Sequence, residues 1–299
     1  MSVRGKSINL FLMDGIASGR VKCTLANWTG LAYRIPRTEL DKCKERDDLK
    51  QSGVYFLFGT SDQTGENVVY IGQAGVRKNG EGILYRLQEH KRNPDKDYWT
   101  EAVVFTTSNN SFGPTEIGYL ENRFCNLATE AKRYIVKNGN DPTLGNITEE
   151  KESELEEFID YAKIVMGTLG HKVFDPIIAV PKAALNSTDT PASDSDEPMF
   201  RFDRTSGKAT GRRTSDGFVV LAGSTLTPNL QPSCPGNVRR LREKYADKID
   251  NNNMLTADVL LTSPSAAASF VGGSSLNGNV VWKTVDGKTL KDVENSELL

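Results

Sequence analysis

Six side chains between residues 50 and 140 could take part in chemistry: Tyr55, Tyr70, Arg86, His90, Glu121 and Asn138. The planar guanidinium of an arginine can donate several hydrogen bonds to phosphate oxygens, and a carboxylate can bind a hard cation such as Mg²⁺. A histidine can exchange a proton near neutral pH, whereas a tyrosine, with a free pKa of about 10, is an unusual base. Each residue alone has an ordinary interpretation as a strand aromatic or a solvated helix charge. Their order and spacing along the predicted elements therefore matter more than their types.

The two tyrosines lie on a predicted hairpin over residues 53–75, where the apolar runs GVYFLFG and VVYIG flank a polar turn. Residues 81–93 predict a helix that ends before Pro94, because proline cannot continue it. Arg86 and His90 are four residues apart on this helix, so we expect their side chains to point the same way.

A strand and a second helix are expected to follow. Residues 99–108 are rich in β-branched and aromatic side chains, which favours a strand. The next helix is expected to begin at Pro114 and stop at Asn138-Gly139, in keeping with proline at helix starts and glycine after helix ends. Glu121 would then lie near the start of this helix, and Asn138 just past its end.

In this order, residues 50–140 resemble the core of the GIY-YIG nuclease superfamily: a GIY strand, a YIG strand, a helix with R-x-x-x-H, a strand, a helix with a glutamate, and an asparagine. Val54 replaces the isoleucine of the first triplet. The asparagine follows Glu121 at a longer interval than the family pattern, so Asn138 and Asn140 both remain candidates for that position. The resemblance implies an α+β fold with a small antiparallel three-stranded sheet flanked by helices, and cleavage of nucleic-acid phosphodiester bonds with a divalent cation.

The resemblance also implies roles for the site residues. Glu121 would hold a single Mg²⁺ or Mn²⁺ ion, since magnesium keeps most of its waters and tolerates few protein ligands. Arg86 would bind the phosphate oxygens as charge builds on them. The hydroxyl groups of Tyr55 and Tyr70 would both lie beside the nucleophilic water, one as the base and the other orienting the water, with Tyr70 favoured as the base. His90 would accept or relay the tyrosyl proton.

The chain is expected to contain a β-rich extension (residues 1–49), the nuclease domain with a trailing helix (50–180), a flexible linker (181–199) and a small separate α+β domain (200–299). The extension should hold strands in INLFLMD and GRVKCTLANWTGLAYRI and a short helix capped by Thr38. The linker is rich in Ser, Thr, Asp and Pro and nearly free of large apolar side chains, so it cannot offset its ordering entropy.

The C-terminal segments TGRRTSDGFVVLAGS and SPSAAASFVGG are similar to a small domain of unknown function that often accompanies such nucleases. Three strands, a basic helix and a second helix that starts at Pro264 with Ser263 as its cap are expected there. The expected strands are residues 200–205, 207–214 and 217–225, and the basic helix is residues 237–248. Residues 279–290 should form a hairpin with Asp286-Gly287 in a tight turn.

Composition limits the possible partners. The 37 Lys and Arg nearly balance the 39 Asp and Glu, so a nucleic-acid surface would have to be local. Basic residues gather near the predicted site and again in the C-terminal part. The first group is Arg77, Lys78, Arg86, Lys91 and Arg92, and the second is Arg212, Arg213, Arg239, Arg240 and Arg242. Either group could neutralise phosphates, and either could equally be a solvated surface.

The cysteines and histidines exclude several kinds of site. The four cysteines (Cys23, Cys43, Cys125, Cys234) are far apart, which argues against a zinc ribbon or a disulfide framework and for reduced thiols in a cytoplasmic protein. Two histidines are too few for a zinc-protease motif. No apolar stretch approaches the roughly 20 residues of a membrane span, so no membrane association is expected.

The sequence therefore predicts a metal-dependent endonuclease that acts on DNA, with the C-terminal domain helping to choose or hold the substrate. A role in restriction or in defence against mobile elements would suit the extra flanking domains. An RNA substrate is an alternative, because such a core recognises phosphate geometry and nothing in the sequence indicates a contact to the 2′-hydroxyl. A second alternative is a nucleic-acid-binding protein with a catalytically retired core. The oligomeric state is not predicted.

Overall fold

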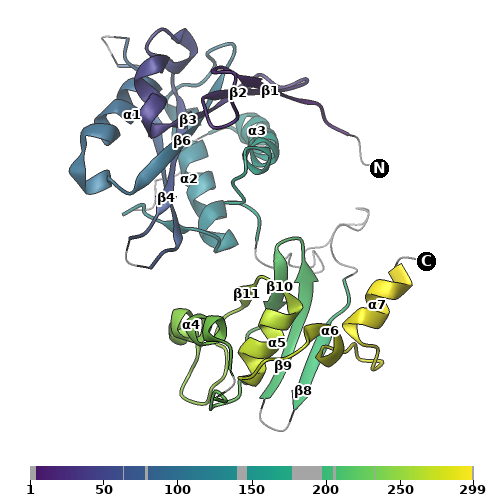
Figure 1. The fold of residues 1–299 in the computed structure, drawn as a ribbon. Helices are drawn as coiled ribbons and strands as arrows, with labels where there is room; N and C mark the ends of the chain where they lie inside the picture. The colour runs from purple at the N-terminus through teal and green to yellow at the C-terminus, as the bar shows by residue number, and fades with distance from the viewer. Residues whose placement is uncertain are drawn as a thin grey trace. The chain divides into compact units, whose positions relative to one another are not determined.

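The computed structural model describes residues 5–62, 64–77, 80–139, 147–176, 197–204, 207–232 and 234–297. The chain divides into two compact units after Pro176 (Figure 1). The expected linker falls at this division, but its residues 181–196 lie outside the described part of the chain. Each unit is described below by itself.

The first unit is built on a seven-stranded mixed sheet in the order β1-β2-β3-β6-β4-β5-β7. Its strands are β1 (Ile8–Leu12), β2 (Val21–Leu25), β3 (Gly30–Pro36), β4 (Gly53–Thr60), β5 (Asn67–Ala74), β6 (Trp99–Thr107) and β7 (Ile135–Val136). Every neighbouring pair is antiparallel except β5 and β7, which are parallel. The expected three-stranded sheet is thus only the centre of a larger one, because β3 pairs with β6 along its whole length and adds the strands of the N-terminal extension.

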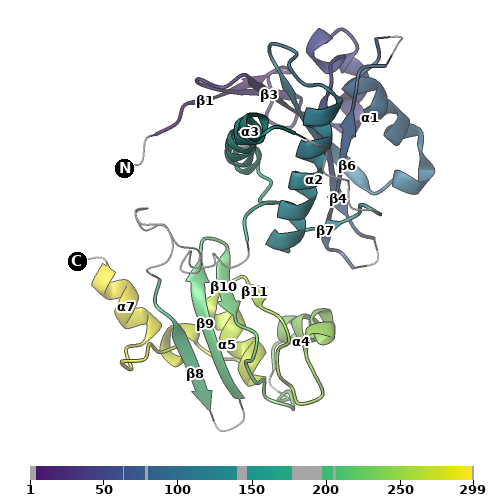
Figure 2. The same ribbon diagram turned by 180° about the vertical axis from the view of Figure 1, so that it is seen from behind.

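Helices cover both faces of this sheet (Figures 1 and 2). One face carries α2 (Pro114–Ala131) and α3 (Glu149–Thr168), and the other carries α1 (Ile83–Arg92) with the short 3₁₀ helices η1 (Arg37–Cys43), η2 (Asp47–Leu49) and η3 (Pro94–Lys96). Thr38 was expected to cap a helix, but η1 begins directly after Pro36 without a side-chain cap.

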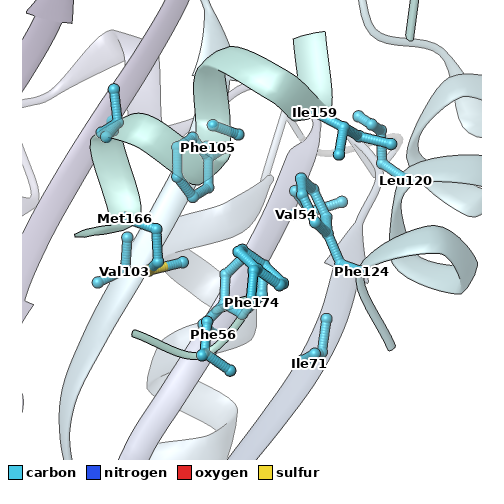
Figure 3. Close-up of a cluster of buried hydrophobic side chains, with 14 of the residues drawn as sticks. Val54, Phe56, Ile71, Val103, Phe105, Leu120, Phe124, Ile159, Met166 and Phe174 are labelled. Atoms are coloured by element: carbon cyan, nitrogen blue, oxygen red, sulfur yellow. The ribbon is translucent and has the colours of Figure 1, made fainter. Parts of the chain in front are cut away.

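Strand β4 is buried on both faces, which explains its nearly continuous apolar sequence. Val54 and Phe56 face α2 and α3, where they pack with Phe124, Ile159 and other apolar side chains (Figure 3). Tyr55 alternates with them and faces α1. This alternation puts the chemistry-bearing tyrosine on the α1 side of the sheet.

Helix α2 is shorter than expected. It ends at Ala131, and Lys132 adopts the left-handed conformation (φ 55°), so the chain turns back and forms β7 beside β5. The predicted stop at Asn138-Gly139 is therefore wrong by about two turns. Tyr134 stabilises this return because its ring packs edge-on against Phe58, with ring centroids 5.5 Å apart.

The second unit is a four-stranded antiparallel sheet in the order β11-β10-β9-β8, packed against helices. Its elements are β8 (Phe200–Arg204), β9 (Gly207–Thr214), β10 (Gly217–Val220), α4 (Gly236–Lys244), a 3₁₀ turn η4 (Ala246–Lys248), β11 (Val259–Leu261), α5 (Pro264–Gly272), α6 (Gly278–Val281) and α7 (Leu290–Glu297). The structure confirms α5, with Ser263 accepting a hydrogen bond from the backbone N–H of Ala266 at 3.1 Å.

The expected hairpin over residues 279–290 is confirmed only in part. Residues 279–281 belong to α6, whereas the backbone N–H groups of Thr284 and Leu290 donate to the carbonyls of Lys288 and Trp282, and a single bridge joins Lys283 and Thr289. The turn at Asp286-Gly287 does exist, with Gly287 at φ 81°. Trp282 is fully buried between Phe202 and Phe218, and the next residue, Lys283, exchanges two backbone hydrogen bonds with Arg201 of β8.

Candidate active site

The hairpin of β4 and β5 brings the two tyrosines to the same face of the sheet. Tyr55 lies opposite Gly72, and Tyr70 lies opposite Leu57, so the two phenol rings are diagonal neighbours with centroids 6.3 Å apart. A Cβ atom at Gly72 would overlap the Tyr55 hydroxyl. The glycine of the YIG triplet is therefore required by the ring of the tyrosine in the other triplet.

Helix α1 places His90 against both tyrosines. Its Nε2 atom lies 2.7 Å from the Tyr55 hydroxyl, and its ring centroid is 5.4 Å from each phenol ring. His90 is only 3% exposed, and burial, with a smaller contribution from the Lys96 and Arg86 charges, lowers its pKa to about 3. The near-neutral pKa expected from the sequence does not hold. A neutral His90 can accept the Tyr55 proton in a hydrogen bond at Nε2 but would not keep that proton as a stable cation.

Arg86 lies one turn before His90 on the same side of α1, and its guanidinium is partly exposed. Its Nη1 donates to Glu89 Oε2 at 2.8 Å, and Arg77 reaches the other oxygen of the same carboxylate at 2.9 Å. The hydrogen bond to Glu89 raises the pKa of Arg86 above its ordinary value, so this side chain stays charged. Glu89 thus orients the arginine and leaves part of the guanidinium open to a ligand.

The two tyrosines differ in exposure. Tyr55 is 1% exposed, and burial is the main reason that its pKa rises far above the ordinary value. Tyr70 is half-buried, and burial together with the Glu121 charge raises its pKa, while Arg86 and a hydrogen bond with Tyr55 act in the opposite direction. Only Tyr70 of the pair therefore keeps access to solvent.

Glu121 reaches the same place from the opposite face of the sheet. It lies near the middle of α2, not near its start as predicted, one turn after Gly118, whose position abuts the Gln73 side chain. Burial raises the pKa of the Glu121 carboxyl, and neighbouring Gln73 and Arg86 lower it. Glu121 and Arg86 both lie close enough to Tyr70 to shift the pKa of its phenol, in opposite directions, and Arg86 also acts on Glu121. Among the described residues, β7 pairs with Val68 and Val69 of β5.

A divalent cation fits this carboxylate. Among the described residues, no lysine, arginine or histidine forms an ion pair with Glu121, although the carboxylate is half-buried. In the same part of the chain no three His, Cys, Asp or Glu side chains form a metal-binding group. A cation at Glu121 would thus have one protein carboxylate, with water or substrate oxygens as its other ligands, which is the coordination that Mg²⁺ commonly has in phosphate-handling sites.

Asn138 pairs with the backbone and does not point at the other site residues. Its Nδ2 donates to the carbonyl of Ile71 at 2.7 Å, and its Oδ1 accepts from the N–H of Ile71 at 3.1 Å. The side chain therefore continues the pairing of β7 with β5 and fixes the strand next to Tyr70. This geometry makes Asn138 a positioning residue; Asn140 lies outside the described residues.

Lys96 is a site residue that sequence reasoning missed. Its Nζ lies 3.4 Å from the centroid of the Tyr70 ring, and burial and the Arg86 charge lower its pKa to about 8. The predicted basic group ended at Arg92, since Lys96 follows the helix-breaking Pro94. An Asn-Pro-Asp turn that reverses the chain was the available signal.

At least three of the basic residues in the C-terminal unit have structural partners. Arg239 donates to the carbonyl of Gln231 at 3.0 Å. Arg213 is held by Glu197, Glu294 and Glu297. Arg242 donates to the carbonyls of Phe270, Val271 and Thr227, two of which belong to the last turn of α5. Arg240 is exposed on α4. The basic group expected there is consequently smaller, and Lys78 of the first group lies outside the described residues.

Residues 200–294 match a domain of unknown function (DUF4357), which agrees with the C-terminal domain expected from the sequence. No curated protein and no solved structure matches the chain. Among the described residues, no helix combines the length and apolar character needed to cross a membrane.

Proposed function

We propose that the first unit is a metal-dependent endonuclease of the GIY-YIG type that hydrolyses phosphodiester bonds of DNA. One observation carries the proposal: Tyr55, Tyr70, Arg86, His90 and Glu121, from four separate elements, converge beside β5, where the Tyr55 hydroxyl lies 2.7 Å from His90 Nε2, the two phenol ring centroids are 6.3 Å apart, and the charges of Arg86 and Glu121 shift the pKa of both tyrosines. Perturbed groups that converge in this way are typical of catalytic sites.

The metal role falls to Glu121, the half-buried carboxylate described above. When bound there, a divalent cation would supply positive charge against the phosphate and the leaving oxygen. Arg86 would bind the phosphate oxygens with the part of its guanidinium that Glu89 leaves open.

The proton role falls to Tyr70. It can reach a nucleophilic water because its side chain is only partly buried, whereas the Tyr55 hydroxyl is buried and already bonded to His90. Tyr55 and His90 then act as a rigid support: neutral His90 accepts from the Tyr55 hydroxyl and keeps its ring in place beside Tyr70. The low pKa of His90 makes it a poor store for a proton released during the reaction.

The test is incubation of the full chain with plasmid, linear and single-stranded DNA and with RNA, in Mg²⁺, Mn²⁺ or EDTA. DNA should be cut only with a divalent cation. Glu121→Gln and Arg86→Ala should each lower the rate by at least about 10²-fold, the usual cost of removing charge stabilisation in a transition state. Glu130→Gln and Arg92→Ala are matched controls, since both side chains are exposed on the same helices, and they should retain the wild-type rate.

The tyrosines test the division of roles. Tyr70→Phe should lower kcat by about 10²–10⁴-fold, as expected for loss of a general base, and Tyr55→Phe should cost less. Equal rates for wild type and Glu121→Gln would refute the metal role. A preference for RNA would move the proposal to the alternative substrate, and absence of any metal-dependent cleavage would favour a retired, binding-only core.

A further inference from the structure

Lys96 approaches the site from a segment that its sequence holds rigidly. Helix α1 ends at Arg92, and the Asn93 side chain then accepts a hydrogen bond from the N–H of Asp95 at 2.9 Å. Pro94 begins the 3₁₀ turn, and the N–H of Lys96 donates to the carbonyl of Asn93 at 3.1 Å. This turn carries Lys96 back over Tyr70 on the neighbouring strand.

Lys96 differs from Arg77, Arg86 and Lys91 in its pairing with acidic residues. Arg77 and Arg86 share Glu89, and Lys91 forms an ion pair with Asp41 at 2.8 Å. Within the described ranges no carboxylate forms an ion pair with Lys96, although the side chain is half-buried. A half-buried ammonium without a counter-charge is unfavourable, and its contact with the face of the Tyr70 ring offsets only part of that cost.

Arg86 adds to this unfavourable arrangement. Its charge is close enough to Lys96 to lower the lysine's pKa, so two cations lie near Tyr70, and Glu89, which holds Arg86, forms no ion pair with Lys96 among the described residues. An anion between or beside the two cations would relieve both effects. The anion that a nuclease site offers is a phosphate of the nucleic-acid backbone.

We propose that Lys96 and Arg86 form a two-cation site for backbone phosphates, in which Lys96 contacts a phosphate of the bound nucleic acid beside Tyr70. The inference rests on the proposed function for the nature of its ligand. It adds a substrate-binding residue and gives Lys96 a role other than packing on the tyrosine.

A lysine that contacts a phosphate changes the salt dependence of binding in a known way. Each phosphate contact on duplex DNA contributes about 0.9 to the slope of log affinity against log salt concentration. Lys96→Met should therefore lower that slope by about 0.9. Lys91→Met removes the same charge from a lysine that is already paired with Asp41, so it should change the slope much less.

The affinity for DNA should also depend on pH, because Lys96 titrates in a range where the neighbouring groups keep their protonation states. The titratable groups near Lys96 and the Tyr70 ring include Tyr70, Arg86, His90, Glu121 and Tyr98, and Asp95 and Asp97 flank the lysine in the chain. His90 has a pKa near 3, Tyr98 has a pKa raised to about 12, Tyr70 is raised above its ordinary value and Arg86 remains charged. Because the charged lysine binds phosphate, wild-type affinity should fall as the pH rises through about 8. Lys96→Arg should keep the salt slope and lose this pH dependence.

The experiment measures anisotropy of a short fluorescein-labelled DNA duplex with the full chain in EDTA, over a salt series of about 50–200 mM and at pH values on either side of 8. The proteins are wild type, Lys96→Met, Lys96→Gln, Lys96→Arg and Lys91→Met; the glutamine variant serves if the methionine variant does not fold. A slope and pH profile of Lys96→Met equal to those of wild type would overturn the proposal and leave Lys96 as a packing residue.

Cleavage is measured separately with Mg²⁺, which separates the two proposals. A wild-type chain that binds in EDTA but never cuts refutes the endonuclease, while the slopes still decide the role of Lys96. A chain that cuts but shows no slope change in Lys96→Met refutes the role of Lys96 alone. A chain that neither binds nor cuts overturns both.

Discussion

Gly72→Ala is expected to damage the site through a single methyl group. Gly72 faces Tyr55 across the β4–β5 pair, and an added Cβ would overlap the hydroxyl and the adjoining ring carbon of the tyrosine and lie 3.0 Å from a further ring carbon. The φ angle of Gly72 is not positive, so alanine is acceptable to the backbone. Any loss in the free energy of unfolding must therefore come from the contact of the new methyl group with Tyr55.

Tyr55 has little room to avoid that methyl group, because it is 1% exposed and bonded to His90. Overpacking of a buried site costs about 1–3 kcal/mol. A displaced Tyr55 would also leave the buried Nε2 of His90 without its donor, at a cost in the same range. We expect Gly72→Ala to lower the free energy of unfolding of the first unit by about 2–3 kcal/mol and to lower any cleavage rate with it.

The assay is urea unfolding of the full chain, with hydrogen exchange in residues 53–75 to assign the transition to the first unit. Gly75→Ala is the control, because a Cβ there meets only Ile117, at an ordinary 3.7 Å. In a Tyr55→Leu background the phenol is absent, so Gly72→Ala should cost less by about 1–2 kcal/mol. An equal cost in both backgrounds would show that Tyr55 is not the reason for the glycine.

Two further predictions concern the support of the site. Folding lowers the pKa of His90 to about 3. The contribution of His90 to the free energy of unfolding is therefore present above about pH 6.5 and is lost as the pH falls toward 3. Over that range wild type should lose about 1.4 kcal/mol per pH unit more than His90→Gln, and parallel acid titrations of the two proteins would contradict the shift. Asn138→Ala removes both hydrogen bonds to Ile71 and should lower the free energy of unfolding in urea by about 1–3 kcal/mol. The control Asn109→Ala, at an exposed position, should stay within about 0.5 kcal/mol of wild type. Similar values for the two variants would argue against the pairing role of Asn138.

Local patterns in the sequence predicted the parts of the fold that depend on neighbouring residues. The two apolar runs around a polar turn became β4 and β5, and the four-residue spacing on α1 put Arg86 and His90 on one side. Ser263 and Pro264 marked the start of α5 for the same reason, since a cap depends on only the next few residues.

Non-local contacts account for what the sequence did not predict. The three-stranded sheet was an underestimate because β3 finds its partner in β6, more than sixty residues later, and no local pattern specifies that choice. The C-terminal hairpin is shorter than predicted, and its residue Lys283 also pairs with Arg201 of β8, about eighty residues earlier, which no local pattern specifies. Lys96 was missed because its approach to Tyr70 depends on the turn after α1 and on the strand beside it.

The longer interval between Glu121 and Asn138 follows from the early end of α2. Because α2 stops at Ala131, the chain has room to form β7 beside β5 before it reaches Asn138. The amide of Asn138 then takes the place of one more paired residue at Ile71, and strand pairing goes no further among the described residues. In the proposed function, Glu121 from one face and Arg86 from the other would act on a common ligand at this end of β5. An asparagine that stops the pairing at this point would serve the site by keeping that edge accessible, without touching the substrate itself.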